Sequence, residues 1–516
     1  MTFEKYSNSL IRFRKIGFSI DLSRMDVSDE FLASMQPKAE KALADLALIE
    51  AGEIANPDEG RMVGHYWLRN PDLAPTAEIK AQITEPLAAL KDFAKKIHTG
   101  QITNPAGQTF KNILIIGIGG SALGPQLIND ALGTVGGMKT YFFDNTDPAG
   151  MDKDLATIGS NLDRTLSVVI SKSGGTPETR NGMIEAKNAY DDLGLEFAKY
   201  AIAITGDGSK LDQFAKAEGF ITTFPMEDWV GGRTSILSTV GLVPMALQGI
   251  DFKAMLDGAR VMDDLTRSSD IAKNPALQLA LSWYHEGHGK GDRDMVVLPY
   301  KDSLVLFSKY LQQLIMESIG KADDLDGNTV NQGLAVYGNK GSTDQHAYLQ
   351  QLRDGLHNFF ATFIEVRKGR KGRSISVDGT NTSADYLQGF LRGTRRALYE
   401  NGRRSVLISI EEVTATTLGY LIALFERTVT FYASMVNINA YHQPGVEAGK
   451  AAATVFLDLL NEVRGHLTAE EKTADDIATE ISGDPEDVFH ALVHLAANGE
   501  VSHVRRETPA QDTFGL

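Results

Sequence analysis

Several short segments of the chain combine residue types that can bind an anion or move a proton. The most informative is Ser-Lys-Ser-Gly-Gly-Thr at residues 171–176, which stands between an apolar run and a helical pattern. Hydroxyls, an ammonium and glycines at such a place suit the dianion of a phosphate monoester, because N–H groups at a helix start point outward. The alternative is an ordinary helix start, capped by Ser173 or Thr176 with Pro177 behind it. Capping leaves Lys172 unexplained, so the pattern favours a phosphate site.

A second Gly-rich turn, Ile-Gly-Ile-Gly-Gly-Ser at residues 116–121, also follows an apolar run and precedes a helical pattern. Its glycines allow a ligand to approach the backbone closely. The turn does not match the GxGxxG fingerprint with a following acidic ribose ligand. It is therefore weak evidence for dinucleotide binding.

Glu317 and Arg233 are candidates for proton transfer and for charge stabilisation. Glu317 ends a predicted helix just before Gly320, where the helix dipole disfavours a carboxylate and raises its proton affinity, as a general base requires. The alternative is a solvated glutamate paired with Lys321. Arg233 follows two glycines in the segment 231–235, and in isolation a surface salt-bridging arginine is the better interpretation.

Two further segments carry polar residues near a predicted helix start. His346 lies in a loop at residues 338–348, and its imidazole suits proton transfer near neutral pH. A lone histidine is more often structural, and no second histidine stands at metal-binding spacing. Gln443 and Lys450 would share one side of a helix, although Pro444 implies that Gln443 precedes that helix.

Two series of apolar strands and helical patterns must position these residues. In each series a continuous apolar run is followed by a helical pattern, which predicts βαβ units and buried parallel sheets. The first series has its apolar runs at 112–117, 166–170 and 200–204, and the second has them at 295–298, 358–366 and 405–410. The opening segment, to about residue 95, is predicted to be helical and connective.

Composition excludes several classes of protein. The 516 residues include no cysteine, which removes disulfides, thiolate metal sites and cysteine nucleophiles and favours the reducing cytoplasm. No signal peptide is visible, and the longest uncharged stretches, such as 234–250, are too short and mixed to span a bilayer. The formal charge of 51 − 67 = −16 argues against nucleic acid as a partner.

The last fifty residues differ from the rest of the chain. Residues 466–516 hold 11 acidic and 3 basic residues, a net charge of 3 − 11 = −8, which leaves −8 for residues 1–465. Their pattern predicts two or three short helices and a final strand at 501–504, similar to a small winged-helix appendage. The body of the chain is thus only mildly acidic, and net charge does not exclude a phosphorylated substrate.

Six motifs, in this order, resemble the glucose-6-phosphate isomerase family: IGIGGSALGP, SKSGGTPET, VGGRTS, QQLIMESIGK, GSTDQHAY and YHQPGVEAGK. The resemblance implies reversible interconversion of glucose 6-phosphate and fructose 6-phosphate, by ring opening and proton transfer through a cis-enediol. It implies no metal and no organic cofactor. It also implies a homodimer in which His346 of one subunit completes the site of its neighbour.

The resemblance assigns roles residue by residue. Glu317 matches the base that moves the proton between C1 and C2, and Arg233 matches the arginine that steadies the enediolate charge. His346 and Lys450 match the residues of ring opening. The remaining matches are substrate and phosphate contacts: Ser171, Lys172, Ser173, Thr176, Gly120, Ser121, Gln313 and Gln443.

The predicted fold class is α/β, with two three-layer αβα domains of the sugar-isomerase (SIS) type, parallel sheets and a small winged-helix-like α appendage. The expected boundaries are 1–100 for an N-terminal helical segment, 101–285 and 286–465 for the α/β domains, and 466–516 for the appendage. Three positions depart from the family pattern, which puts KM rather than the reaction in doubt: Ile319, Thr234 and His442.

Other functions stay open at this point. One is dual action on glucose 6-phosphate and mannose 6-phosphate, and another is a sugar-phosphate regulator without catalysis. The regulator predicts a phosphate cradle without Glu317, His346 and Lys450, whereas all three residues are present. The expected partners are a hexose 6-phosphate and a second copy of the chain, with neither nucleic acid nor membrane. Residues 466–516 are either a regulatory or partner-binding module or, as we favour, a solubilising appendage.

Overall fold

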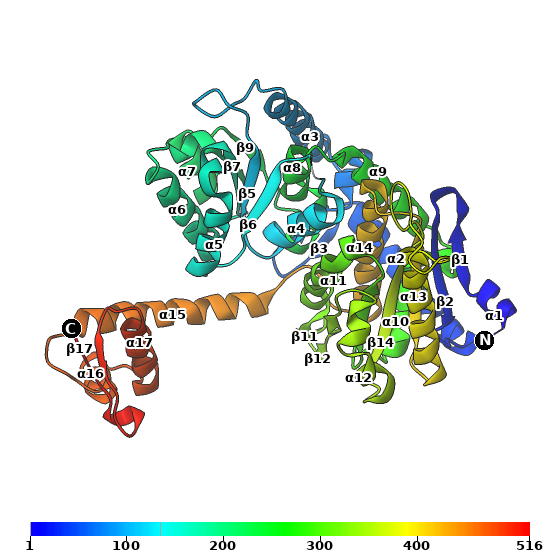
Figure 1. Ribbon diagram of the computed structural model, residues 1–516. Coiled ribbons are helices and arrows are strands. Elements are labelled where there is room, and N and C mark those ends of the chain that lie inside the picture. Colours follow the sequence, from blue (N-terminus) through cyan, green and yellow to red (C-terminus); the bar gives the residue numbers. More distant parts are fainter. Residues whose placement is uncertain (1, 135) are drawn as a thin grey trace. The chain divides into compact units, whose positions relative to one another are not determined.

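The computed structural model describes residues 2–134 and 136–516, without the side chains of residues 447, 448, 450 and 451. The chain forms two compact units, Met1–His442 and Gln443–Leu516 (Figure 1). Among the described helices, none combines the length and the apolar character that crossing a bilayer requires.

The first sheet of the larger unit has five parallel strands in the order β6-β5-β7-β8-β9. Strands β5 and β7 are buried along their whole length, as the apolar runs predict. The strands are β5 (Asn112–Ile116), β6 (Lys139–Phe143), β7 (Thr165–Ile170), β8 (Ala201–Thr205) and β9 (Thr222–Pro225). The helices between them are α4 (Gly120–Leu132), α5 (Pro148–Ile158), α6 (Pro177–Asp191) and α7 (Lys210–Glu218).

The second sheet has six strands in the order β1-β2-β15-β14-β10-β13. Its four parallel strands are β10 (Asp294–Pro299), β13 (Val336–Tyr337), β14 (Phe359–Val366) and β15 (Ser405–Ile410). The helices of this half are α11 (Val305–Leu311), α12 (Leu349–Asp354), α13 (Ser383–Glu400) and α14 (Ala415–Met435). The prediction of two α/β halves with parallel sheets is confirmed.

The beginning of the chain corrects one expectation. The opening segment was expected to be helical, but β1 (Leu10–Phe13) and β2 (Phe18–Arg24) form antiparallel strands that extend the second sheet. Ile20 of β2 lies opposite Ile408 of β15. That pairing partner lies far along the chain, so no local pattern revealed it. The helices expected after it are α2 (Asp29–Glu50) and α3 (Ala77–His98), with a short α1 (Phe3–Asn8) before β1.

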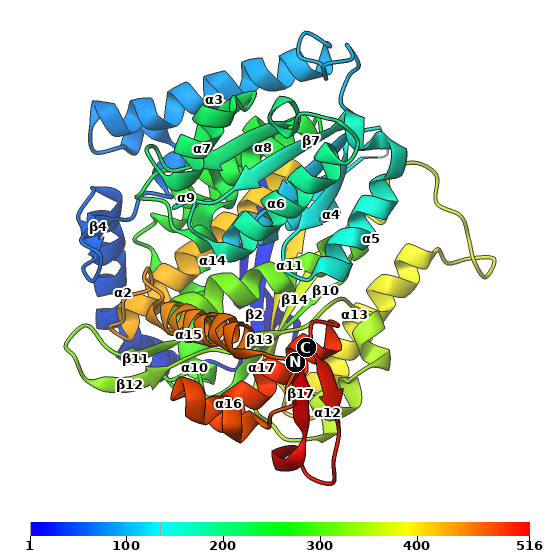
Figure 2. The same cartoon turned by 90° about the vertical axis from the view of Figure 1, so that its left-hand side faces the viewer.

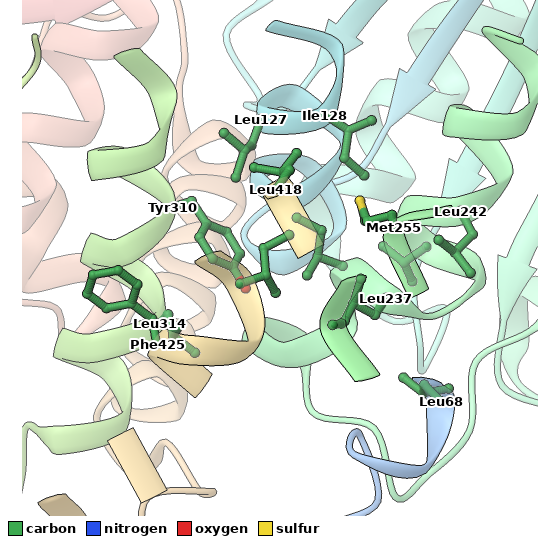
Figure 3. Packing of buried hydrophobic residues seen from close by; sticks show 14 of the residues in the cluster. Leu68, Leu127, Ile128, Leu237, Leu242, Met255, Tyr310, Leu314, Leu418 and Phe425 are labelled. Carbon is green, nitrogen blue, oxygen red and sulfur yellow. The ribbon is translucent and has the colours of Figure 1, made fainter. Parts of the chain in front are cut away.

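Helices between the two sheets share one apolar core, which Figure 3 shows from close by. The helices are α8 (Thr239–Leu247), α9 (Phe252–Thr266) and α10 (Pro275–Glu286), together with α4, α11 and α14. Side chains from all of them except α10 appear in the figure: Leu127, Ile128, Leu242, Met255, Tyr310, Leu418 and Phe425. Because the core is continuous, both halves form one packed body on which a site can be held rigidly. Two hairpins complete this unit: β3 (Ile54–Asn56) with β4 (Arg61–Met62), and β11 (Lys321–Asp323) with β12 (Thr329–Gln332).

A buried ionic cluster joins α2, α9 and α14 inside this body. Asp263 accepts hydrogen bonds from both Arg69, at 2.6 and 2.8 Å, and Arg427, at 2.7 Å. Arg69 also pairs with Glu426, and Arg427 with Glu50. The side chains of Arg69, Arg427, Asp263 and Glu426 have no exposed surface.

The smaller unit contains α15 (Pro444–His466), α16 (Ala474–Ile481), α17 (Pro485–Ala497) and the antiparallel pair β16 (Ser502–Val504) and β17 (Thr513–Gly515). The short helices and final strand expected beyond residue 466 are therefore present. Sequence analysis placed α15 in the preceding domain, but Leu460 and Val463 of this helix pack with Leu492 and Phe514 of the smaller unit. The boundary near residue 285 and the winged-helix likeness stay predictions.

Candidate active site

The predicted phosphate loop, residues 171–176, connects the end of β7 to the start of α6. The buried Ser171 hydroxyl accepts the Gly174 N–H at 3.1 Å and donates to the Thr176 hydroxyl at 3.3 Å. The Ser173 hydroxyl accepts the Gly175 N–H at 3.1 Å. Thr176 occupies the N-cap position of α6 without a capping hydrogen bond from its side chain. Helix capping thus does not explain the hydroxyls, which leaves the phosphate interpretation in place.

Lys172 joins the phosphate loop to the segment that precedes Arg233. Its ammonium donates to the carbonyls of Asp228, at 2.8 Å, and Val230, at 3.1 Å. Burial lowers the pKa of Lys172, and the nearby Asp228 carboxylate partly opposes that shift. The ammonium therefore has two main-chain partners of its own, and it contributes positive charge at one wall of the loop.

Arg233 and Glu317, the residues predicted to stabilise charge and to act as the base, form an ion pair. Nη1 of Arg233 lies 2.9 Å from Oε2 of Glu317, and the two side chains are 4% and 21% exposed. Nη2 of Arg233 donates to the His442 carbonyl at 3.1 Å. Burial lowers the pKa of Arg233, while the Glu317 carboxylate opposes this. Arg233 is thus not a surface residue, and its guanidinium is held between two partners.

Glu317 ends a π-helical turn, Gln312–Glu317, that continues α11. Such turns are rare and occur frequently at functional sites. Lys321 reaches back to this turn and donates to the Glu317 carbonyl at 2.7 Å and to the Gly320 carbonyl at 3.3 Å. Lys321 therefore binds the main chain of Glu317, whereas the carboxylate pairs with Arg233.

Lys321 is a buried cation beside this pair. The residue is 6% exposed. Burial and the positive charge of Arg233 lower the pKa of Lys321 to about 7. Sequence analysis named Lys321 only as an alternative partner of Glu317, because its burial depends on tertiary packing that the local pattern does not reveal.

Close backbone contacts bring the Gly-rich turn to the same place. A Cβ atom on Gly120 would lie 1.9 Å from the Gly232 carbonyl oxygen, so only glycine allows this approach. Gly119 has φ +58°, and a Cβ atom there would lie 3.2 Å from Nε2 of Gln313. A Cβ atom on Gly117 would meet the Ser121 side chain at 2.9 Å and the Ile170 carbonyl, at the end of β7, at 3.2 Å. The structure thus gathers Gly120, Ser121, Gln313, Arg233, Glu317 and the beginning of the phosphate loop.

His346 lies on the short turn Thr343–His346, and it is exposed. The buried Asp344 carboxylate fixes the turn by accepting the Asn339 N–H at 2.8 Å and the Tyr348 hydroxyl. Within residues 2–134 and 136–516, no hydrogen bond or ion pair joins His346 to Glu317 or Arg233. Its part in the site stays a prediction.

Gln443 and Lys450 belong to the smaller unit. Gln443 is exposed at the N-cap of α15, and the side chain of Lys450 lies outside the described residues. Their predicted roles as a substrate contact and a ring-opening residue therefore rest on the resemblance alone.

Comparison with known proteins supplies independent evidence. The family model for phosphoglucose isomerase matches residues 21–389 and 357–475. The chain belongs to the phosphoglucose isomerase family. It is 60% identical to the glucose-6-phosphate isomerase of Trichormus variabilis, in an alignment that covers 96% of this chain and 95% of that protein. It is 57% identical to the glucose-6-phosphate isomerase of Geotalea daltonii, in an alignment that covers 97% of this chain and 96% of that protein.

A solved structure of the family has the same fold. The crystal structure of a glucose-6-phosphate isomerase from Chlamydia trachomatis superposes with a TM-score of 0.80 at 25% identity, covering 89% of this chain and 92% of that one. This solved structure thus also supports the predicted fold class of two α/β halves with parallel sheets.

The three departures from the family pattern lie around the Arg233–Glu317 pair without removing either charge. Thr234 donates from its hydroxyl to the Gly231 carbonyl at 3.2 Å, which holds the turn that carries Arg233. Ile319 is fully buried. His442 accepts from Arg233 through its carbonyl, and its Nε2 lies 3.7 Å from Asp58. Burial lowers the pKa of His442, which the Asp58 carboxylate partly opposes. Asp58 gave no signal in the sequence, because it acts through a contact between distant segments.

Proposed function

We propose that the chain interconverts glucose 6-phosphate and fructose 6-phosphate. The observation that carries the proposal is the Arg233–Glu317 pair, at 2.9 Å, beside the Gly-rich turn and the hydroxyl-rich loop after β7. A carboxylate, a fixed cation and an anion-binding loop are the parts that an aldose–ketose isomerisation of a phosphorylated sugar requires. Membership of the phosphoglucose isomerase family supports the same substrate class.

The reaction is a transfer of one proton between neighbouring carbons. In the open-chain aldose, Glu317 takes the proton from C2, and the electron pair forms the C1–C2 double bond of a cis-enediol. Negative charge then develops on the sugar oxygens, and the buried guanidinium of Arg233 stabilises it. Glu317 returns the proton to C1 while the proton of the C2 hydroxyl passes to O1, so that C2 becomes the carbonyl carbon of the ketose. No electrons are gained or lost overall.

The other predicted residues bind the substrate and open its ring. The phosphate would occupy the loop that contains Ser171, Lys172, Ser173 and Thr176. The remaining substrate contacts would be Gly120, Ser121, Gln313 and Gln443. His346 and Lys450 would move protons between the ring oxygen and the C1 hydroxyl, so that the sugar reaches Glu317 in its open form.

We infer that His346 acts in the site of a second copy of the chain. Its exposure supports this, because an exposed imidazole on a fixed turn is available to a neighbour. An open cavity of about 440 Å³ lies on the same loop, at Ser342, and it is lined by the exposed apolar side chains of Val377, Tyr386 and Phe390. Exposed apolar patches of this kind mark protein interfaces. A cytoplasmic location belongs to the same proposal and rests on the absence of cysteine from the chain.

A coupled assay tests the activity. Purified full-length protein should convert fructose 6-phosphate to glucose 6-phosphate, detected by oxidation of the glucose 6-phosphate formed. Solvent tritium should also enter C2 of the sugar during turnover. Tight binding of fructose 6-phosphate without either signal would instead identify a sugar-phosphate regulator.

Subunit complementation tests the role of His346. Glu317→Gln and His346→Ala each inactivate a homodimer, but a mixed dimer would contain one site with an intact glutamate and an intact histidine. Co-expression of both variants should therefore recover about one quarter of wild-type activity, since about half of the dimers are mixed and each has one working site. If His346 served its own subunit, the mixed dimer would contain no working site and co-expression would recover nothing.

A further inference from the structure

The segment between β14 and α13 carries a concentration of positive charge that the proposed reaction does not use. Residues 367–373, Arg-Lys-Gly-Arg-Lys-Gly-Arg, hold five cations and no acid, in a chain whose net charge is −16. Figure 2 draws this loop in yellow, leading into α13. The alternative is an ordinary solvated loop, which would explain a run of cations. It would not explain the cavity that this segment borders.

The segment forms one side of a cavity of about 150 Å³. Four cationic residues line the cavity, namely Lys301, Arg367, Lys368 and Arg370, together with Ser374 and Ser383. No carboxylate is among the described lining residues. Its volume is about half of the ~300 Å³ at which pockets for drug-sized ligands begin, so a small anion fits and a nucleotide does not.

The cavity occupies a distinctive place in the second sheet. From β10 the chain continues to β13 on one side, and from β14 it continues to β15 on the other side, so the direction of winding changes between β10 and β14. Ligands of α/β sheets bind outside the carboxyl ends of the strands at this point. Lys301 follows β10 and Arg367 follows β14.

The first sheet has its own change of direction between β5 and β7, which continue to β6 and β8. The Gly-rich turn and the phosphate loop follow those two strands. The cavity therefore lies at the position in the second sheet that corresponds to the predicted substrate phosphate site in the first.

Hydrogen bonds and close packing hold the walls of the cavity. The Lys301 ammonium donates to the Gly369 carbonyl at 2.6 Å, and the Gln388 amide donates to the Val366 carbonyl at 3.1 Å. A Cβ atom on Gly369 would lie 2.6 Å from Cβ of Ala384, so the loop packs directly on the first turn of α13.

The lining cations differ in how far their charge is compensated. Arg367 pairs with Glu411 at 2.6 Å, and Lys368 pairs with Glu412 at 3.2 Å. Arg370 has no ion pair within the part of the chain that the structure describes. An uncompensated guanidinium beside hydroxyls and further cations is the donor set that phosphate oxygens prefer.

We propose that this cavity binds a phosphate dianion, either free phosphate or the phosphate group of a small monoester, at a site separate from the substrate site. Arg370 supplies the uncompensated charge, Lys301 and the paired cations supply the surrounding positive potential, and Ser374 and Ser383 supply hydroxyl donors.

Equilibrium dialysis of the full-length protein with radiolabelled orthophosphate at low ionic strength tests the proposal. The wild type should bind two phosphates per chain. One occupies the substrate site, where Ser171→Ala weakens binding, and the other occupies the cavity. Arg370→Met should weaken the second site by about 10- to 100-fold, as expected for a lost charge-assisted hydrogen bond. Glycerol 3-phosphate should displace the label from this site if monoesters bind there, whereas displacement by orthophosphate alone would identify free phosphate as the ligand.

The neighbouring Lys371 provides a matched control, because it carries the same charge in the same segment but does not line the cavity. Lys371→Met should keep the second phosphate. Equal losses of second-site phosphate binding in Arg370→Met and Lys371→Met would overturn the proposal. They would indicate that the segment attracts anions diffusely, including acidic segments of this chain. Binding of a single phosphate that Ser171→Ala abolishes would overturn it too. Unchanged melting temperatures of both variants would exclude unfolding as the cause.

Discussion

The protein contains two groups of arginines and carboxylates that differ in one respect. In the buried cluster, Asp263 contacts both Arg69 and Arg427, and none of these side chains reaches solvent. In the site, the Arg233 side chain is 4% exposed, and its partner Glu317 is 21% exposed. The fully buried charges of the cluster are closed to a ligand, whereas the site keeps one carboxylate partly exposed.

The pKa values of the acids follow the number of cations that each one contacts. Asp263 contacts two guanidiniums, which overcome burial and lower its pKa to about 2. Glu426 contacts one, and there burial prevails and raises the pKa to about 7. Within the cluster, the acid with two guanidinium partners is therefore the one that stays charged.

The largest effect is expected from Glu317→Gln. The amide keeps the size of the side chain but cannot take up a proton, so kcat should fall by ~10²- to 10⁴-fold. The buried Arg233 loses its paired carboxylate, but Glu317 is partly exposed, so the free energy of unfolding should fall by less than in Asp263→Asn. The coupled assay and urea unfolding together check this, and a variant with near-normal turnover would remove Glu317 as the base.

Asp263→Asn should have the opposite profile. Loss of this carboxylate leaves two buried guanidiniums without their shared partner, which should lower the free energy of unfolding by ~3–5 kcal/mol. The folded fraction should retain its KM, because Asp263 lies outside the site. Urea unfolding monitored by circular dichroism measures the change. A loss of turnover without a loss of stability would contradict the division between the two groups.

Lys321→Met tests the buried cation beside the site through pH. The pKa of Lys321 in the folded protein is lowered to about 7, from 10.5 in the unfolded chain. Between these values the unfolded chain binds the proton and the folded protein does not, so stability rises with pH, by up to about 1.4 kcal/mol per unit. The free energy of unfolding of the wild type, minus that of the variant, should therefore increase between pH 7 and pH 9. A constant difference would indicate that Lys321 stays charged in the folded protein.

The smallest effect is expected from Ser171→Ala in the phosphate loop. Removing one neutral hydroxyl should raise KM for fructose 6-phosphate by ~2- to 10-fold with kcat nearly unchanged, as expected for one lost hydrogen bond. Thr205→Val is the control, because the Thr205 hydroxyl supports the loop through the Ser171 carbonyl, at 2.6 Å, without facing a ligand by our proposal. Equal changes in KM for both variants would point to loop stability rather than to phosphate contact.

Local patterns predicted the parts of the molecule that depend on neighbouring residues. The apolar runs became β5, β7, β14 and β15, and the Gly-rich turn and the phosphate loop follow their strands as expected. Only the resemblance placed Arg233 and Glu317 in one site, since each residue alone fitted a surface interpretation, and their ion pair was not predicted. The burial of Lys321, the Asp58–His442 contact and the grouping of α15 with the smaller unit depend on packing between distant segments. The roles of His346, Gln443 and Lys450 stay predictions.

The pairing of β2 with β15 affects how the protein is made. Strands β1 and β2 complete a sheet whose other four strands lie between residues 294 and 410. During synthesis, β2 can pair with β1 at once, but it emerges from the ribosome long before β15, so the edge that β15 covers stays unpaired until residue 410 has been made. An unpaired strand edge is prone to aggregation. We therefore expect slow translation between β2 and β15, or a shortage of chaperones, to lower the yield of this protein more than that of a protein whose strands pair locally.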